Sequence, residues 1–441
     1  MNSSLKRKVG ILSCALMLSF SLHAVADSND YNGSDDSEYN DDENYDDSSF
    51  DDEYSDDEYY DDSSDEDYSD NEDSSDEETE DPIFEIVRTG TLDEIKGVLT
   101  EKKDEYGNSL LMVACSNNRE KEIISYFIST GSRIDGRNYA GATPLMLACE
   151  SSSDTEVIGL LLKQNAKIGA IDDNGQNPLM YAARNGSPDI LKMLLKSGAD
   201  VKVKDENRQS VLSHVCMNAS SPVELIATLI KSGLDVNETD MNGQTPLMQA
   251  AANNAPVAVI EALLKAGAKA GVVDEYGSSP LMLACSGSGD VAVIKALLRV
   301  GSDVNLLDDY HYSALLYAIN NENSEEVVSM LLQAGAKSTV TGNDGFNALM
   351  MAAYYGRAEV VPALVKAGVP LNSFDDEGKT ALIHACEQAE SPDIVSALLA
   401  AGADISIADE TGKTAYGYAQ ENSALEDDDV LGKLEGPLTA L

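Results

Sequence analysis

The chain has 441 residues, of which 78 are Asp or Glu and 30 are Lys or Arg, so its formal net charge is −48. A charge this negative argues against nucleic-acid binding, because phosphate recognition depends on clustered Lys and Arg. The charge is spread unevenly: residues 1–26 contain no acid, and residues 27–81 contain 29 acids and no Lys or Arg. Residues 82–441 contain the other 49 acids and 27 bases, without a basic stripe. These differences divide the chain into three parts.

Residues 1–26 have the three parts of a secretory signal peptide. Residues 6–8 are positively charged, residues 9–22 form an apolar run, and the sequence AVA closes the segment. The apolar run is too short for a membrane span, which needs about 20 residues, and no later segment is suited to one. Cys14 could carry a lipoprotein anchor, but the apolar run continues beyond it, which argues against this. We therefore expect cleavage before Asp27 and export of the mature protein to the periplasm or the exterior.

Residues 27–81 have the composition of a disordered acidic segment. Of these 55 residues 29 are acidic, most of the others are Ser, Tyr or Asn, and Phe50 is the only strongly apolar one. Like charges repel and there is almost nothing to bury, so the segment should stay extended. A stretch around Gly33 partly matches a calcium-binding loop, but Ser28 and Tyr39 fall at its first and last positions. We favour a solubilising spacer, with weak diffuse cation binding as the alternative.

From Pro82 onward the sequence repeats with a period of about 34 residues. Most units begin with an Asp-x-x-Gly pattern, and a second marker, usually Gly, recurs at the same interval. A period this regular predicts a stacked solenoid rather than several separate domains. The first residues of the ten patterns are Asp104, Asn138, Asp172, Asp205, Asp240, Asp274, Asp308, Gly342, Asp375 and Asp409.

Each unit predicts a tight turn followed by two helices. Asp-x-x-Gly suits a turn because Gly tolerates positive φ. Two residues after it every unit has Ser, Thr or Asn, which cap helix N-termini, and in four units Pro follows at the first helical position. A second helix follows, as in SPDILKMLLKSGAD, where apolar residues recur at helical spacing until Gly198. The ten capping residues are Ser109, Thr143, Asn177, Ser210, Thr245, Ser279, Ser313, Asn347, Thr380 and Thr414.

This unit resembles the ankyrin repeat. The stretches DNGQNPLMYAARNGSPDILKMLLKSGADV (residues 173–201) and DMNGQTPLMQAAANNAPVAVIEALLKAGA (residues 240–268) look like the family pattern almost throughout. Nine such units cover residues 104–408, with an N-terminal capping repeat at 82–103 and a C-terminal capping repeat at 409–441. The resemblance implies an all-α solenoid of stacked helix-turn-helix units joined by β-turn or hairpin loops. It also implies a protein-binding function.

The chain departs from the family pattern at two sets of positions. Where the family has a His that bridges neighbouring loops, this chain has Met112, Met146, Met180, Ser213, Met248, Met282, Leu316, Met350 and Ile383. We expect this row to rely on packing, since Met fills irregular gaps; a redox-sensitive or metal-binding role is the less favoured reading. Arg208 and His311 replace the turn Gly in two units, where we expect distorted turns.

Five cysteines share one position on the first helix of their units: Cys115, Cys149, Cys216, Cys285 and Cys386. Only Cys115 and Cys149 belong to neighbouring units. Helix layers lie about 8–10 Å apart, more than the roughly 7 Å between Cα atoms that a disulfide permits. There is no C-x-x-C pair and no His at metal-ligand spacing, so we expect no metal site. The five thiols should be reduced and buried.

No arrangement of residues indicates catalysis. His214 and His384 follow the Met row on the first helix, where a structural role is favoured over a catalytic one. The stretch CSGSGD at residues 285–290 lies between two expected helices, without the preceding strand that a nucleophile elbow or phosphate loop requires. We therefore predict no enzymatic activity and no cofactor.

Aromatic residues gather at the contact positions of the sixth to eighth units. In the family, contacts come from residues that flank the turn Gly and from those just after the small residues of the first helix. The partner-binding residues we predict are Tyr276, Tyr310, Tyr312, Phe346, Tyr354, Tyr355 and Lys379. Tyr is enriched at binding hot spots. The alternative is that these aromatics suit an extended turn or pack on neighbouring units, and Tyr106 and Tyr139, far from the patch, favour it.

The sequence therefore predicts an exported, monomeric, non-enzymatic scaffold that binds a protein partner on the concave face of the solenoid. The alternative is that the acidic segment is the active part, a polyanion that engages basic proteins or cations, with the repeats as its carrier. Deletion of residues 27–81 separates the two, because a scaffold keeps its partner and a polyanion loses it.

Residues 27–81 should be dispensable for folding, because the stability of a repeat array comes from contacts between neighbouring units. Thermal unfolding of chains that begin at Asp27 and at Asp81 should be equally cooperative. The shorter chain should gain some stability at low salt, where repulsion between like charges is screened least. A clear loss of cooperativity on deletion would show instead that the acidic segment is structural.

Overall fold

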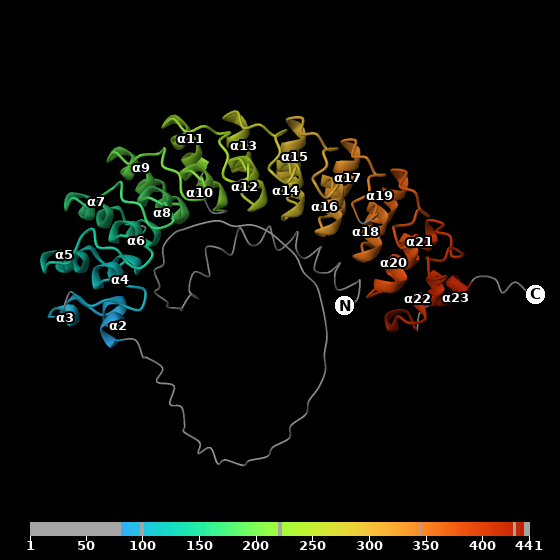
Figure 1. Cartoon of the computed structure of the whole chain (residues 1–441), viewed down its shortest axis with the longest axis horizontal. Coiled ribbons are helices and arrows are strands. Elements are labelled where there is room, and N and C mark those ends of the chain that lie inside the picture. The colour runs from blue at the N-terminus through green and yellow to red at the C-terminus, as the bar shows by residue number, and fades with distance from the viewer. Residues whose placement is uncertain are drawn as a thin grey trace, which may run out of the picture. The chain divides into compact units, whose positions relative to one another are not determined.

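A computed structural model describes residues 81–97, 101–152, 154–218, 223–343, 345–426 and 429–435. In this part of the chain 22 α-helices and two short 3-10 helices form, and the only β-structure is isolated bridges (Figure 1). The prediction of an all-α solenoid is confirmed. The predictions for the signal peptide and for residues 27–80 of the acidic segment lie outside the described residues.

Each unit supplies an inner helix and an outer helix, which lie along opposite sides of the curved stack (Figure 1). The inner helices are α4 (Leu110–Ser116), α6 (Pro144–Ser151), α8 (Pro178–Asn185), α10 (Val211–Met217), α12 (Pro246–Ala252), α14 (Pro280–Ser286), α16 (Ala314–Asn320), α18 (Ala348–Tyr354), α20 (Ala381–Gln388) and α22 (Ala415–Ala419). The outer helices are α5 (Lys121–Ser129), α7 (Thr155–Lys163), α9 (Pro188–Lys196), α11 (Val223–Lys231), α13 (Val257–Lys265), α15 (Val291–Arg299), α17 (Glu325–Gln333), α19 (Val361–Lys366), α21 (Asp393–Ala400) and α23 (Val430–Glu435).

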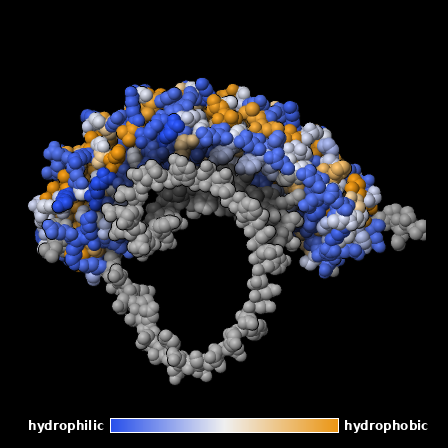
Figure 2. All heavy atoms as spheres, viewed as in Figure 1, coloured by the Kyte–Doolittle hydropathy of each residue, from blue (hydrophilic) through white to orange (hydrophobic). Residues whose placement is uncertain are grey.

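Four elements lie outside these pairs of inner and outer helices. Helices α2 (Pro82–Thr89) and α3 (Leu92–Ile95) pack on α4 and α5. The 3-10 helices η1 (Ala358–Val360) and η2 (Ser423–Leu425) precede α19 and α23. Figure 2 shows hydrophilic residues over most of the visible surface of the repeats, with hydrophobic residues scattered among them.

All ten predicted capping residues stand at the N-cap of an inner helix. In nine of them the side-chain oxygen accepts a hydrogen bond from a backbone N–H of the first helical turn; Thr414 is the exception. Such a cap contributes about 1 kcal/mol to stability. The sequence prediction of where the inner helices begin is confirmed in every unit.

The Met row packs as expected and also forms a contact that the sequence did not predict. Met112 and Met146 are buried, and each sulfur accepts the backbone N–H of its own N-cap residue at 3.3 Å. Met248 and Met282 do the same at 3.4 Å. Thioether sulfur is a weak acceptor, so packing remains the main contribution of these side chains.

The core is a continuous row of aliphatic side chains between the inner and outer helices. In one unit Leu145 of α6 and Ile158 and Leu161 of α7 are at most 1% exposed. Full burial of such a side chain contributes about 1.5–3 kcal/mol. The five cysteines lie in this core as free thiols, which confirms the predicted burial. Burial raises the pKa of Cys386 to about 12 and raises the pKa values of the other four as well.

A buried carboxylate holds each Asp-x-x-Gly turn. Asp172 is 4% exposed, and its Oδ1 accepts the backbone N–H groups of Asn174 and Gln176 at 3.0 and 2.7 Å. Its Oδ2 accepts the hydroxyl of Tyr181, nine residues further on, at 2.8 Å. We call the first Asp of a unit the turn carboxylate. The turn and the inner helix of one unit are thereby joined.

The same pairing at nine residues occurs in six units. The side chain on the inner helix is Tyr, His or Gln, and the distance to Oδ2 is 2.6–3.0 Å. The pairs are Asp172 with Tyr181, Asp205 with His214, Asp240 with Gln249, Asp308 with Tyr317, Asp375 with His384, and Asp409 with Tyr418. His214 and His384 therefore serve as partners of turn carboxylates.

In the other four units the residue nine positions on is apolar, and in two of them a different side chain donates to the turn carboxylate. Asn108 and Gln244 donate to the second oxygens of Asp104 and Asp274 at 3.0 and 3.2 Å. The remaining two units begin with Asn138 and Gly342, which carry no carboxylate.

The predicted distortion of the turns at Arg208 and His311 is wrong. Both residues adopt φ values of 60° and 61°, close to those of the turn glycines. Their backbone N–H groups donate to Asp205 O and Asp308 O at 2.8 and 2.9 Å, as in an ordinary turn. A side chain in this region costs roughly 1–2 kcal/mol, which the hydrogen bonds to the turn carboxylate offset.

The five cysteines should resist alkylation in the native protein, because the thiolate is the reactive form and burial raises every thiol pKa. Native protein at neutral pH should label slowly, and five thiols should label after denaturation without reductant. Rapid native labelling, or fewer than five thiols after denaturation, would contradict the buried, reduced state.

Candidate protein-binding surface

Backbone hydrogen bonds connect successive turns and thereby hold their exposed residues in register. The residue after the first position of one turn donates its N–H to a carbonyl in the preceding turn. Asp309 N donates to Tyr276 O at 3.0 Å, and Asn343 N donates to Tyr310 O at 3.2 Å. The same bond joins Glu206 to the turn before it, at 2.9 Å. The turns of the sixth to eighth units therefore form one surface.

Tyr276 and Tyr310 occupy identical positions in adjacent turns. Both follow their turn carboxylate by two residues, and they are 48% and 40% exposed. Tyr312 is half-buried, and its ring centroid lies 5.5 Å from that of Tyr317. Since Tyr317 is hydrogen-bonded to Asp308 at 2.6 Å, the turn carboxylate indirectly positions Tyr312.

Phe346, Tyr354 and Tyr355 form a second aromatic group. Phe346 is only 4% exposed, and its ring lies 4.5 Å from the imidazole of His384 and 5.9 Å from Tyr354. Tyr354 and Tyr355 are half-buried, and their ring centroids lie 5.2 Å apart. Phe346 therefore supports the surface from beneath rather than forming its outer layer, as the packing alternative anticipated for such residues. Whether the seven residues bind a partner stays a prediction.

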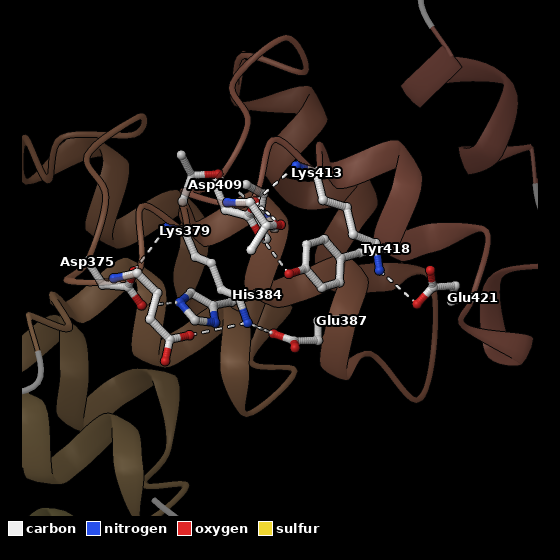
Figure 3. A network of polar contacts seen from close by, with 12 residues as sticks. Asp375, Lys379, His384, Glu387, Asp409, Lys413, Tyr418 and Glu421 are labelled. Carbon is white, nitrogen blue, oxygen red and sulfur yellow. Dashed lines mark hydrogen bonds and ion pairs between the residues drawn. The ribbon is translucent and has the colours of Figure 1, made fainter. Parts of the chain in front are cut away.

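Lys379 belongs to a separate polar network (Figure 3). Its ammonium lies 2.7 Å from Glu387 and 3.5 Å from Glu377, and its side chain is 12% exposed. Lys413 makes the equivalent contact in the next unit, 2.7 Å from Glu421.

Both lysines of this network lie against Tyr418. Their ammonium groups are 5.1 Å (Lys379) and 3.8 Å (Lys413) from the centroid of its ring. Ion pairs and cation–π contacts within the chain thus already hold Lys379 in place.

Two turn carboxylates in this network have lowered pKa values. Burial alone would raise the pKa of Asp375, but hydrogen bonds from His384 at 2.8 Å and from backbone N–H groups outweigh it. At Asp409 burial is likewise outweighed, by hydrogen bonds from Tyr418, Thr411 and the backbone, and the pKa falls to about 2. Both carboxylates are therefore ionised at neutral pH and hold their turns as anions.

A shallow groove of about 870 Å³ lies on the outer side of the stack, lined by Leu162, Asn165, Ile168 and Met193 among others. In the described residues, no group of three His, Cys, Asp or Glu side chains could hold a metal ion. No described helix is long and apolar enough to cross a membrane.

The sequence reasoning missed the residues that pair with the turn carboxylates, apart from the structural role assigned to His214 and His384. The signal was present, since Tyr, His or Gln follows the Asp by nine residues in six units. It was hidden because three chemically different side chains serve the same purpose.

Comparison with known protein families identifies the same repeat. A family model described as "Ankyrin repeats (3 copies)" matches residues 83–172, 111–205, 179–274, 247–342 and 315–409, which together cover residues 83–409. A search of curated proteins finds no match.

Replacing Tyr418 with Phe should destabilise the protein by about 1–2 kcal/mol at neutral pH, because a hydrogen bond to an ionised carboxylate is lost while the ring stays. The folded pKa of Asp409, about 2, lies below its ordinary value of 3.8, so this contribution is complete above pH 3.8 and disappears as the pH falls towards 2. The difference in unfolding free energy should therefore shrink in acid.

Tyr416→Phe is the matched control, since this half-buried tyrosine lies on the same helix and none of the described hydrogen bonds involves its hydroxyl. Equal unfolding temperatures for the two variants at neutral pH would show that the Asp409 contact contributes nothing.

Proposed function

Because the chain belongs to the ankyrin-repeat family, we propose that it is a non-enzymatic scaffold that binds a protein partner on the turns and inner helices of its sixth to eighth units. Repeats of this family indicate protein–protein interaction. The position on the stack is our inference. The excess of acids over bases in residues 82–441 favours a protein over a nucleic acid as the partner.

The observation that carries this proposal is the pair of exposed tyrosines on adjacent turns. Tyr276 and Tyr310 are large and apolar, and 48% and 40% of their surfaces are accessible. Tyr offers a broad contact area at a small entropic cost, since it has only two side-chain torsions. Two such side chains at the same position of neighbouring units suit contact with one partner.

Rigidity beneath these tyrosines supports the same conclusion. The backbone N–H groups of Tyr310 and Tyr312 both donate to Asp308, at 3.0 and 2.8 Å. Tyr276 donates in the same way to Asp274 at 3.0 Å. Because the turns are ordered before binding, the partner does not have to supply the free energy for ordering them.

We also propose that the protein acts as a monomer outside the cytoplasm, in the periplasm or the exterior. The signal-peptide pattern of residues 1–26 supports export. The five buried thiols fit an oxidising compartment, because burial and raised pKa values protect them from disulfide exchange.

The alternative function, a polyanion acting through residues 27–81, rests on the 29 acids of that segment. The two functions differ in what deletion of the segment does to partner capture. The scaffold function is favoured because the exposed tyrosines lie on the repeats.

Replacing Tyr276 and Tyr310 with Ala should lower partner capture about tenfold or more, because truncation of a hot-spot tyrosine costs about 1–2 kcal/mol. The measurement is chemical crosslinking and pull-down of the mature protein from the cells that export it, with quantitative mass spectrometry. Circular dichroism first confirms that the variant unfolds at the parent's temperature.

The chain offers a close control at its other end. Tyr106 stands at the same turn position in the first unit and is 45% exposed, and Tyr139 in the second unit is 72% exposed. Capture should survive Tyr106→Ala with Tyr139→Ala. If this control pair loses the partner while the Tyr276 and Tyr310 variant keeps it, the binding surface lies at the N-terminal end.

A further inference from the structure

The turns that carry the exposed tyrosines also carry exposed carboxylates. Glu275 and Asp309 directly follow the turn carboxylates of the sixth and seventh units, and both are exposed. No described Lys, Arg or His forms an ion pair with either of them. Each therefore presents a full negative charge beside an aromatic ring, next to Tyr276 in one turn and Tyr310 in the other.

The third unit treats the same position differently. Asp173 stands at the position of Glu275, but the guanidinium of Arg137 in the preceding unit lies 2.8 Å from its carboxylate. Arg184 in turn pairs with Glu150 at 3.0 Å. The charge is thus balanced at Asp173 and unbalanced on the two adjacent aromatic turns, so charge complementarity favours a cationic partner at the aromatic turns.

Each of these turns also exposes one aliphatic side chain. Val273 and Leu307 precede the turn carboxylates and are 46% and 40% exposed. The two turns thus share one pattern of exposed residues, an aliphatic side chain, a carboxylate and a tyrosine. We call these six residues, Val273, Glu275, Tyr276, Leu307, Asp309 and Tyr310, the turn surface.

The distance between the two turns matches the repeat of one extended peptide conformation. Stacked helix layers lie about 8–10 Å apart, and the hydrogen bond from Asp309 N to Tyr276 O keeps the two turns adjacent. A polyproline II segment has three residues per turn and rises about 3.1 Å per residue, so every third side chain points the same way about 9 Å further on. One such segment can therefore present the same residue type to both turns.

We propose that the turn surface binds an extended, proline-containing segment of the partner protein that carries Lys or Arg at every third residue. The proposal rests on the proposed function and adds the chemistry of the partner. The cationic ends pair with Glu275 and Asp309, while their aliphatic stems and the proline rings lie against Tyr276 and Tyr310. A cation near a tyrosine ring gains a further attraction from the ring quadrupole.

Two synthetic peptides of identical composition test the spacing. In acetyl-GSKPSKPSKPSG the lysines fall at every third residue, and in acetyl-GSPSPSPSKKKG they are adjacent. Their charges are equal, so attraction to the acidic segment of the full chain is the same for both. Binding is followed by fluorescence anisotropy at physiological salt, and zero-length carbodiimide crosslinks between lysines and carboxylates are mapped by mass spectrometry.

The spaced peptide should bind about threefold to tenfold more tightly than the clustered one, the range expected for two exposed ion pairs with aromatic support. Its crosslinks should concentrate on Glu275 and Asp309. Glu275→Gln with Asp309→Asn should abolish the preference, as should Tyr276→Ala with Tyr310→Ala.

The control removes two exposed carboxylates from the same turn position elsewhere. Glu105→Gln with Glu206→Gln leaves the aromatic turns intact and should keep the preference for the spaced peptide. Equal binding of the two peptides to the parent, or equal loss in both pairs of carboxylate variants, overturns the proposal. If the peptides bind equally but Tyr276→Ala with Tyr310→Ala still loses the natural partner, the proposed function stands and only the partner's chemistry is wrong.

Discussion

Burial of one carboxylate at the start of eight of the ten turns is the constraint on which the rest of the solenoid depends. A buried charge is costly unless hydrogen bonds satisfy its oxygens, and here two backbone N–H groups and one side chain do so. The balance differs among units: burial raises the pKa values of Asp274 and Asp308, whereas at Asp375 the hydrogen bonds prevail and the pKa is lowered. A turn fixed in this way places the N-cap of the inner helix and the N–H that bonds to the preceding turn.

The same carboxylates connect the core to the candidate binding surface. Tyr317 satisfies Asp308 and lies against Tyr312, and His384 satisfies Asp375 and lies against Phe346. The side chains that stabilise two turns are therefore the ones on which two of the predicted contact aromatics rest. Stability and recognition share residues in this part of the stack, so binding variants must be tested for folding.

Sequence reasoning succeeded where the signal is local. Period, caps and helix starts depend on neighbouring residues, and Thr143 or Ser279 caps its helix whatever the next unit contains. It failed where the outcome depends on contacts between units. Phe346 and Tyr310 both fall at contact positions, but only Phe346 is covered, because His384 of the next unit packs on its ring. The turn at Arg208 was misjudged for a different, local reason: the missing Gly was weighed without the hydrogen bonds that Asp205 accepts within the same turn.

The unit that begins with Gly342 has no side chain at the position of the turn carboxylate, whereas in the second unit the amide oxygen of Asn138 takes its place and accepts the backbone N–H groups of Ala140 and Ala142 at 3.1 and 2.8 Å. Under a pulling force, the turn of the unit that begins with Gly342 should therefore open before the turns that a side-chain oxygen holds. This turn directly follows the turn of Tyr310, to whose carbonyl Asn343 N donates at 3.2 Å. A ligand long enough to reach from Asp309 to Asp376 would span this turn, and the array would be stiffer under load when occupied than when empty.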